Sequence, residues 1–273
     1  MPQHFQPFVQ VRENCLLLYD RPAIPFSHKR NTSGFSKAYS GQVAEGTQQR
    51  IRKTIDIFLQ LTPERMIWNP VVNCSHPFRL GFVTLTISDT GRMLTAKEGH
   101  SELLAPWLRT MRRRGIGNYI WKAELQERGQ LHYHVTVDEF LHWQVIRNEW
   151  NKLQKKAGLL DGFARKQGHF NPNSTDVHAV RNIKNFEAYL AKYLAKSDQN
   201  QDATKGKVWD CSKELKRERF SGGIDYETNI NIANAIAKGA KVKRLEHCSI
   251  LVYKNHKSLI SPALSTSYDD WKK

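Results

Sequence analysis

Two strands joined by a tight turn are predicted by the segment Asn118-Tyr-Ile-Trp-Lys-Ala-Glu-Leu-Gln-Glu-Arg-Gly-Gln-Leu-His-Tyr-His-Val-Thr-Val137. Residues 119–126 and 131–137 are rich in the aromatic and β-branched side chains that favour strands. Gly129, between them, is free to adopt the positive φ that tight hairpin loops need. The segment therefore predicts a β-hairpin, and the rest of the chain can be placed around it.

The register of this hairpin brings three polar side chains together. A three-residue loop closed by a glycine bulge pairs Gln126 with Gln130. Counting back along the ladder puts Glu124 opposite His132. His134 is two residues further on, so both imidazoles project from the same face of the sheet. The hairpin thus predicts a cluster of two imidazoles and one carboxylate.

Such a cluster has the chemistry of a divalent-metal site. Two histidines and a carboxylate suit Mg²⁺, Mn²⁺ or a first-row transition metal. The alternative is that His132 and His134 are ordinary sheet residues and that Glu124 is solvated, because a bare His-x-His motif recurs by chance in a chain with 11 histidines. The spacing to Glu124 and the apolar flanks of the motif favour the metal site.

Composition points to a polyanionic partner. The 273 residues carry a formal net charge of +16, which favours nucleic acid. Seven tryptophans and nine tyrosines offer rings on which unpaired bases can stack. The four cysteines form no CxxC pair, so a zinc finger is disfavoured and free thiols in a reducing, intracellular compartment are expected. No apolar run is long enough to span a bilayer, so no membrane partner is expected.

Local patterns predict the other elements. Alternating apolar and hydroxyl residues indicate strands, a 3.6-residue period indicates helices, and proline or polar runs indicate loops. The expected strands are one within 9–19, then 82–88, 176–180 and 249–253; the expected helices are 47–61, 101–112, 142–156, 182–196 and 225–238; loops are expected at 65–77 and 158–172.

Several polar residues near the hairpin are predicted DNA contacts. Thr84 and Thr86 share the polar face of strand 82–88, and Lys122 lies opposite one of the histidines. The run Arg112-Arg113-Arg114 leads directly into the hairpin. Three consecutive arginines are commonly a solvated helix end, but beside a nucleic-acid site they also suit phosphate contacts.

A second informative stretch is the predicted helix 182–196. Tyr189 and Tyr193 lie one turn apart on one face, and Lys192 and Lys196 lie on the neighbouring stripe. One interpretation is a tyrosine stripe packed against the sheet, with solvated lysines. The other is a pair of nucleophiles, because a nearby cation and ammonium make phenol attack on a phosphate feasible at neutral pH.

In order and spacing, these stretches resemble the three motifs of the HUH endonucleases, the rolling-circle replication initiators (Rep) of phages, plasmids and single-stranded DNA viruses. Phe82-Val-Thr-Leu-Thr resembles their first strand motif, and Trp121 to His134 resembles their metal motif with its upstream carboxylate. Tyr189-Leu-Ala-Lys-Tyr-Leu-Ala-Lys196 resembles their catalytic helix, and Gly206 to Ser212 resembles a strand that follows it in phage-type members. The resemblance covers about residues 80 to 215.

The resemblance implies an α+β fold, with a central antiparallel sheet and flanking helices as in HUH/Rep endonucleases. We expect one main domain with N- and C-terminal extensions. Residues 1–79 would form an N-terminal extension with one helix, 80–215 the endonuclease core, and 216–273 a C-terminal extension that either completes the same core or stands beside it.

The resemblance also implies an activity. Glu124, His132 and His134 would hold Mg²⁺ or Mn²⁺, and a tyrosine would nick single-stranded origin DNA at a stem-loop, leaving a covalent 5′-phosphotyrosine that later rejoins strands. In some plasmid relatives a glutamate occupies the place of Tyr189, which favours Tyr193 as the primary nucleophile, whereas two-tyrosine phage initiators use both. Lys196, with Lys192, would position phosphate.

The resemblance leaves partners and alternatives to be separated. The chain contains no P-loop motif, so a host helicase as well as a host polymerase is expected. The expected location is the cytoplasm of a bacterial host, or the nucleus of a eukaryotic one. An HUH-type transposase uses the same chemistry on another target, and a conjugative relaxase is disfavoured because those enzymes often carry a third histidine where Glu124 stands. A non-catalytic single-stranded nucleic-acid-binding protein is the alternative from a different class.

Overall fold

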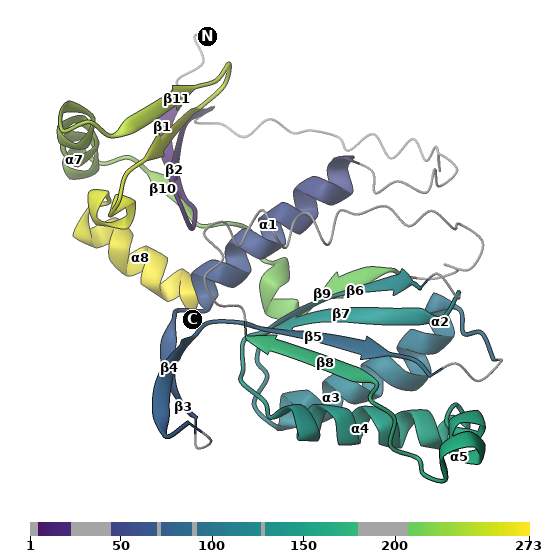
Figure 1. Ribbon diagram of the computed structural model, residues 1–273. Coiled ribbons are helices and arrows are strands. Elements are labelled where there is room, and N and C mark those ends of the chain that lie inside the picture. Colours follow the sequence, from purple (N-terminus) through teal and green to yellow (C-terminus); the bar gives the residue numbers. More distant parts are fainter. Residues whose placement is uncertain (1–4, 23–44, 70–71, 89–91, 127–128, 180–206) are drawn as a thin grey trace, which may run out of the picture. The chain divides into compact units, whose positions relative to one another are not determined.

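A computed structural model describes residues 5–22, 45–69, 72–88, 92–126, 129–179 and 207–273. The chain divides into two compact units (Figure 1). The central unit comprises Ala38–Phe58 and Thr62–Lys216, and the terminal unit comprises Met1–Lys37, Leu59–Leu61 and Arg217–Lys273. The mixture of helices and antiparallel sheets confirms the predicted α+β class.

The central unit is built on a five-stranded antiparallel sheet with the order β8-β5-β7-β6-β9. Its hairpin has the predicted register: Glu124 pairs with His132, and the amide of Gln126 donates to the carbonyl of Gln130 at 2.8 Å. Gly129 has φ +80°, as a glycine bulge requires. The strands are β5 (Gly81–Thr86), β6 (Tyr119–Leu125), β7 (Leu131–Val137), β8 (Thr175–Ala179) and β9 (Trp209–Cys211).

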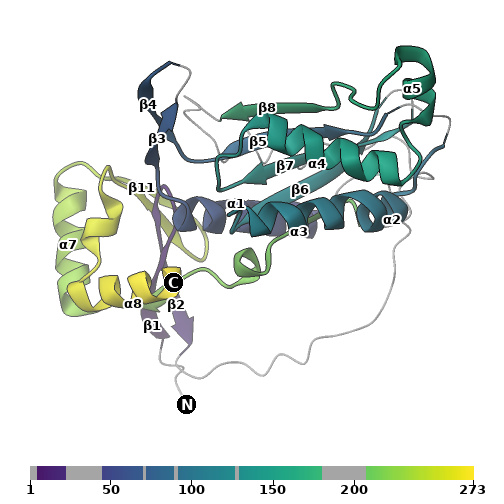
Figure 2. The same ribbon diagram turned by 90° about the horizontal axis from the view of Figure 1, so that it is seen from below.

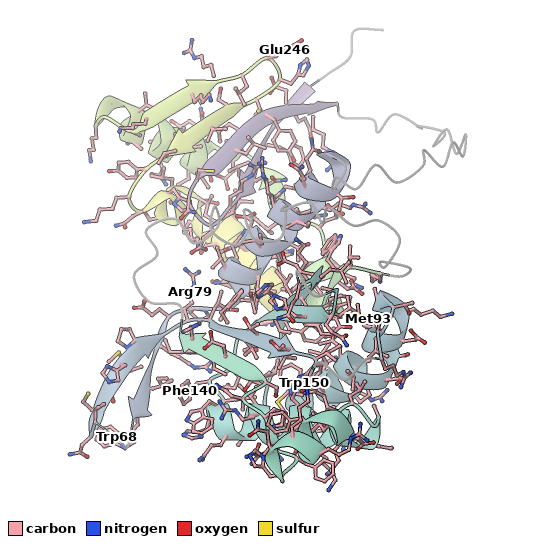
Figure 3. All side chains as sticks on the ribbon, turned by 45° about the vertical axis from the view of Figure 1, so that its right-hand side comes forward. Trp68, Arg79, Met93, Phe140, Trp150 and Glu246 are labelled. Atoms are coloured by element: carbon pink, nitrogen blue, oxygen red, sulfur yellow. The ribbon has the colours of Figure 1, made fainter. Side chains whose placement is uncertain are left out.

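Two helices cover one face of this sheet, α3 (Ala105–Arg113) and α4 (Trp143–Lys156) (Figures 1 and 2). Tyr133 of β7 is fully buried there with Trp107 and Trp150 from the two helices. The indole of Trp150, labelled in Figure 3, also donates to a sheet carbonyl at 2.8 Å. Helix α3 is preceded by α2 (Ala96–Gly99) and a π-helical turn at His100–Leu104, which accommodates the proline at the start of α3.

Two segments predicted as loops contain regular structure. Residues 65–77 form a hairpin of β3 (Arg65–Asn69) and β4 (Cys74–Phe78), because Pro77 lies in a two-stranded ribbon, where a missing amide is tolerated. Figure 3 shows Trp68 on this ribbon, where it is 57% exposed. The predicted loop 158–172 contains the short helix α5 (Asp161–Gln167). The predicted helix 47–61 is confirmed as α1 (Glu45–Leu61).

The terminal unit contains a second antiparallel sheet, with the order β10-β1-β2-β12-β11. The single strand expected within residues 9–19 is wrong, because the polar residues 12–14 form a turn between two paired strands, closed by the amide of Arg12 and the carbonyl of Cys15. The strands are β1 (Phe5–Val11), β2 (Leu16–Pro22), β10 (Ser221–Gly223), β11 (Lys241–Arg244) and β12 (Ser249–Val252), and the helices are α7 (Tyr226–Ala237) and α8 (Pro262–Lys272).

Among the helices that the structure describes, none combines the length and the apolar character that a membrane span requires. All four cysteines are free thiols.

Candidate metal centre

Glu124, His132 and His134 converge on the face of the central sheet opposite α3 and α4. Their possible ligand atoms all lie within 4.8 Å of one another. The two Nε2 atoms face each other at 2.7 Å, and one carboxylate oxygen of Glu124 lies 3.3 Å from Nε2 of His134. Because strand residues alternate between faces, β7 sends Tyr133 into the core and its two imidazoles to the other side.

Neighbouring side chains orient both imidazoles. Thr84 lies on β5 directly opposite His134, and its hydroxyl is 3.2 Å from Nδ1 of that ring. The side-chain amide of Gln126 lies 3.2 Å from Nδ1 of His132. When these groups accept the Nδ1 protons, with the amide oxygen of Gln126 turned to the ring, both Nε2 atoms present lone pairs to the centre of the cluster. The ring of Phe82 stacks on His134 with 5.3 Å between centroids.

A buried lysine completes the cluster. The side chain of Lys122 is 2% exposed, and its ammonium donates to Oε1 of Glu124 at 2.7 Å. Burial alone would raise the pKa of Glu124. When Nε2 of His134 carries a proton instead of a lone pair, hydrogen bonds from it and from Lys122 outweigh burial and lower this pKa to about 2. Burial, together with the charge of His134, lowers the pKa of His132 to about 4. At neutral pH the site therefore holds a carboxylate and an imidazole with an available lone pair.

The donor set fits a divalent cation. Two imidazole nitrogens that face each other at 2.7 Å need either a shared proton or a cation between their lone pairs. Two ligand atoms that bind a cation at right angles, with bonds of about 2.1 Å, are about 3 Å apart. The two Nε2 atoms therefore need to separate only slightly to bind one cation. One carboxylate and two neutral imidazoles also leave coordination positions for substrate oxygen and water.

The other predicted DNA contacts differ in whether they share a sheet face with this cluster. Thr86 is on the same sheet face, opposite His132. Arg112, Arg113 and Arg114 are exposed at the end of α3, on the opposite side of the sheet and at the end of β6 away from Glu124, so the structure does not bring them to the cluster. The guanidinium of Arg112 lies 3.6 Å from Glu214, and that of Arg114 lies 2.7 Å from Glu149.

Tyr189, Lys192, Tyr193 and Lys196 lie outside the described residues, so their predicted roles stay predictions. The sequence interpretation did not identify Gln126 as a partner of the site. Its signal was available, because it lies two residues beyond Glu124 and therefore on the same face of the hairpin.

Residues 81–198 match the family model described as Replication-associated protein ORF2/G2P. This span begins with β5 and includes the whole hairpin that carries the cluster. No curated protein and no solved structure matches the chain significantly. The family match confirms the resemblance to Rep-type replication initiators that the motifs indicated, and it associates this part of the chain with DNA replication.

Proposed function

We propose that this protein initiates rolling-circle replication by nicking single-stranded origin DNA through a tyrosine and later rejoining the strands. The observation that carries the proposal is the convergence of two Nε2 atoms and an ionised carboxylate on one sheet face, within a segment that matches a replication-associated family. The partners would be a single-stranded stem-loop, a host polymerase and a host helicase.

Glu124, His132 and His134 would hold Mg²⁺ or Mn²⁺ in this site. When bound, such a cation supplies a Lewis acid that withdraws charge from a non-bridging phosphate oxygen. Thr84 would keep the ring of His134 turned so that its Nε2 faces the cation. Lys122 would hold one oxygen of Glu124, which leaves the other oxygen on the histidine side.

The phenolic oxygen of Tyr193 would attack the scissile phosphorus. A new phosphorus–oxygen bond to tyrosine forms and the bond to the 3′ oxygen breaks. The phenol loses its proton and the leaving 3′ oxygen gains one, so the products are a 5′-phosphotyrosine and a free 3′-hydroxyl. Polymerase would extend that hydroxyl. Attack by a 3′-hydroxyl on the phosphotyrosine reverses the exchange, so rejoining needs no nucleotide cofactor. Tyr189 would serve the second transfer, and Lys196 and Lys192 would bind phosphate oxygens.

The test is covalent capture of labelled single-stranded DNA. A pool of oligonucleotides that tiles the DNA flanking the gene is incubated with the protein in Mn²⁺ or in EDTA, and adducts that survive phenol extraction and denaturing electrophoresis are counted. We expect adducts only with the cation, and none with His132→Ala or Tyr193→Phe. Tyr226→Phe, a change at an 82% exposed tyrosine of the terminal unit, is the matched control.

The outcomes separate the alternatives. Full adduct formation by Tyr193→Phe moves the nucleophile to Tyr189. Adducts confined to terminal repeats, rather than to a stem-loop, indicate a transposase with the same chemistry. Salt-sensitive retention with no adduct in any divalent cation identifies a non-catalytic binding protein and refutes the proposed activity.

A further inference from the structure

The terminal sheet packs one face under α7 and α8. On the opposite face the side chains of Phe8, Leu17 and Tyr19 are only half-buried, and we call it the open face. Val9 and Leu251 are fully buried with Ile232 of α7 and Tyr268 of α8. Since strand residues alternate, their immediate neighbours point to the opposite face. On β1 these neighbours include Phe8, which pairs directly with Tyr19 of β2.

Two aromatic rings lie side by side on this open face. The centroids of Phe8 and Tyr19 are 6.0 Å apart, and both side chains are half-buried, so their rings are partly accessible. The guanidinium of Arg21, two residues beyond Tyr19 on the same face, lies 5.4 Å from the Phe8 centroid. Aromatic rings with an adjacent guanidinium are surfaces on which bases stack.

The charged side chains at the described positions of the open face are all basic. Lys241 and Lys243 of β11 are exposed, and the register places them beside Val252 and Ile250 on the same face as Leu17. Asp20 points to the other face, and the described positions of the open face include no acidic side chain. With strands about 4.8 Å apart, the lysines lie about 14 Å from β1, across the sheet from the rings.

We propose that this open face binds single-stranded DNA, with bases stacked on Phe8 and Tyr19 and the backbone held by Arg21, Lys241 and Lys243. Half-buried rings on a sheet beside cations suit unpaired bases and phosphates together. Single-stranded DNA offers a flat base for each ring and a phosphate for each cation in one repeating unit. The site is separate from the cluster of histidines and needs no divalent cation, so it goes beyond the proposed nicking activity.

Fluorescence anisotropy of the full chain with a labelled twelve-residue oligothymidylate, in EDTA, tests the proposal. Phe8→Ala and Tyr19→Ala should each weaken binding roughly tenfold, because a stacked base contributes roughly 1–3 kcal/mol. Tyr226→Ala, at an exposed ring on α7 in the layer that covers the other face, should leave the affinity unchanged. Nicking is scored separately, as covalent adducts in Mn²⁺, so the failure of nicking and the failure of this cation-independent site are distinguishable.

The charges give a second readout that does not depend on the packed rings. The double variant Lys241→Ala/Lys243→Ala should reduce the slope of log affinity against log salt by about 1.4, or about 0.7 for each lost phosphate contact. Lys238→Ala, at the end of α7, should leave the slope unchanged. Both lysines of the double variant are exposed, so this test remains valid even where an aromatic substitution impairs folding.

Photocrosslinking from 5-iododeoxyuridine to a peptide containing Phe8 or Tyr19, located by mass spectrometry, would support the proposal. Wild-type affinity and slope in the aromatic and lysine variants would overturn it. A change in sedimentation from dimer to monomer with unchanged DNA affinity would also overturn it, and would assign the face to contacts between two copies of the chain.

Discussion

Replacing the buried Lys122 by methionine tests whether the ammonium and Glu124 act as a charge pair. Methionine has a similar length and no charge, so the change removes the cation with little loss of volume. Removing one partner of a buried pair costs about 3–5 kcal/mol, because an uncompensated charge is left behind. The Glu124 side chain is 14% exposed, so we expect the lower end, about 3 kcal/mol.

That loss is measurable by thermal unfolding followed by tryptophan fluorescence. Trp271 is the one tryptophan of the seven outside the central unit, so the signal reports mainly on the unit that contains Lys122. For a unit of this size, about 3 kcal/mol lowers Tm by about 6–12 °C. Lys152→Met, at an exposed position on α4, is the matched control and should leave Tm nearly unchanged.

Two further measurements identify the cause. The double variant Lys122→Met/Glu124→Gln should regain most of the lost stability, because no charge is then buried alone. Added Mn²⁺ should raise Tm more in Lys122→Met than in wild type. In the variant the carboxylate of Glu124 has lost the ammonium, and the bound cation would supply the missing positive charge. Wild-type stability in Lys122→Met would refute the charge-pair argument. A large loss without recovery in the double variant would assign the effect to packing.

Three other changes probe the surroundings of the site. Thr84→Val should weaken Mn²⁺ binding, measured by calorimetry, by about tenfold through loss of the hydroxyl that orients a histidine, whereas Thr86→Val on the same face should not. Tyr133→Phe should raise the free energy of unfolding in guanidinium by about 1 kcal/mol, because the described residues offer its buried hydroxyl no hydrogen-bond partner. Burial raises the pKa of Cys211 to about 11, so at pH 8 iodoacetamide should label exposed Cys74 and spare Cys211, as read by peptide mass spectrometry; labelling of both at equal rates would contradict the burial.

The hairpin was predictable because its signals are local. A glycine loop of three residues sets the pairing, and the alternation of β7 then assigns every side chain to a face. The same counting brought Glu124 and His132 together. It did not show that Lys122 is buried, because burial depends on segments that are distant in the sequence.

The terminal sheet was less predictable for the same reason. Its strands β1 and β2 pair with β10 and β12, which lie about two hundred residues later, and no local pattern specifies such partners. The position of the arginines at 112–114 also depends on packing that no local pattern specifies. They precede the hairpin in sequence, but a helix that packs under the sheet ends on the side away from the imidazoles.

Strand β7 makes the stability of the core and the chemistry of the site depend on one register. Its odd-numbered residues, such as Tyr133, fill the core against Trp150, and its even-numbered residues present the two imidazoles on the other face. A slip of one residue would bury both imidazoles among tryptophans and expose the apolar side chains. The large cost of burying unpaired polar rings therefore opposes any register in which the cluster is broken. The folding of the core thus fixes the arrangement of Glu124, His132 and His134 on the opposite face.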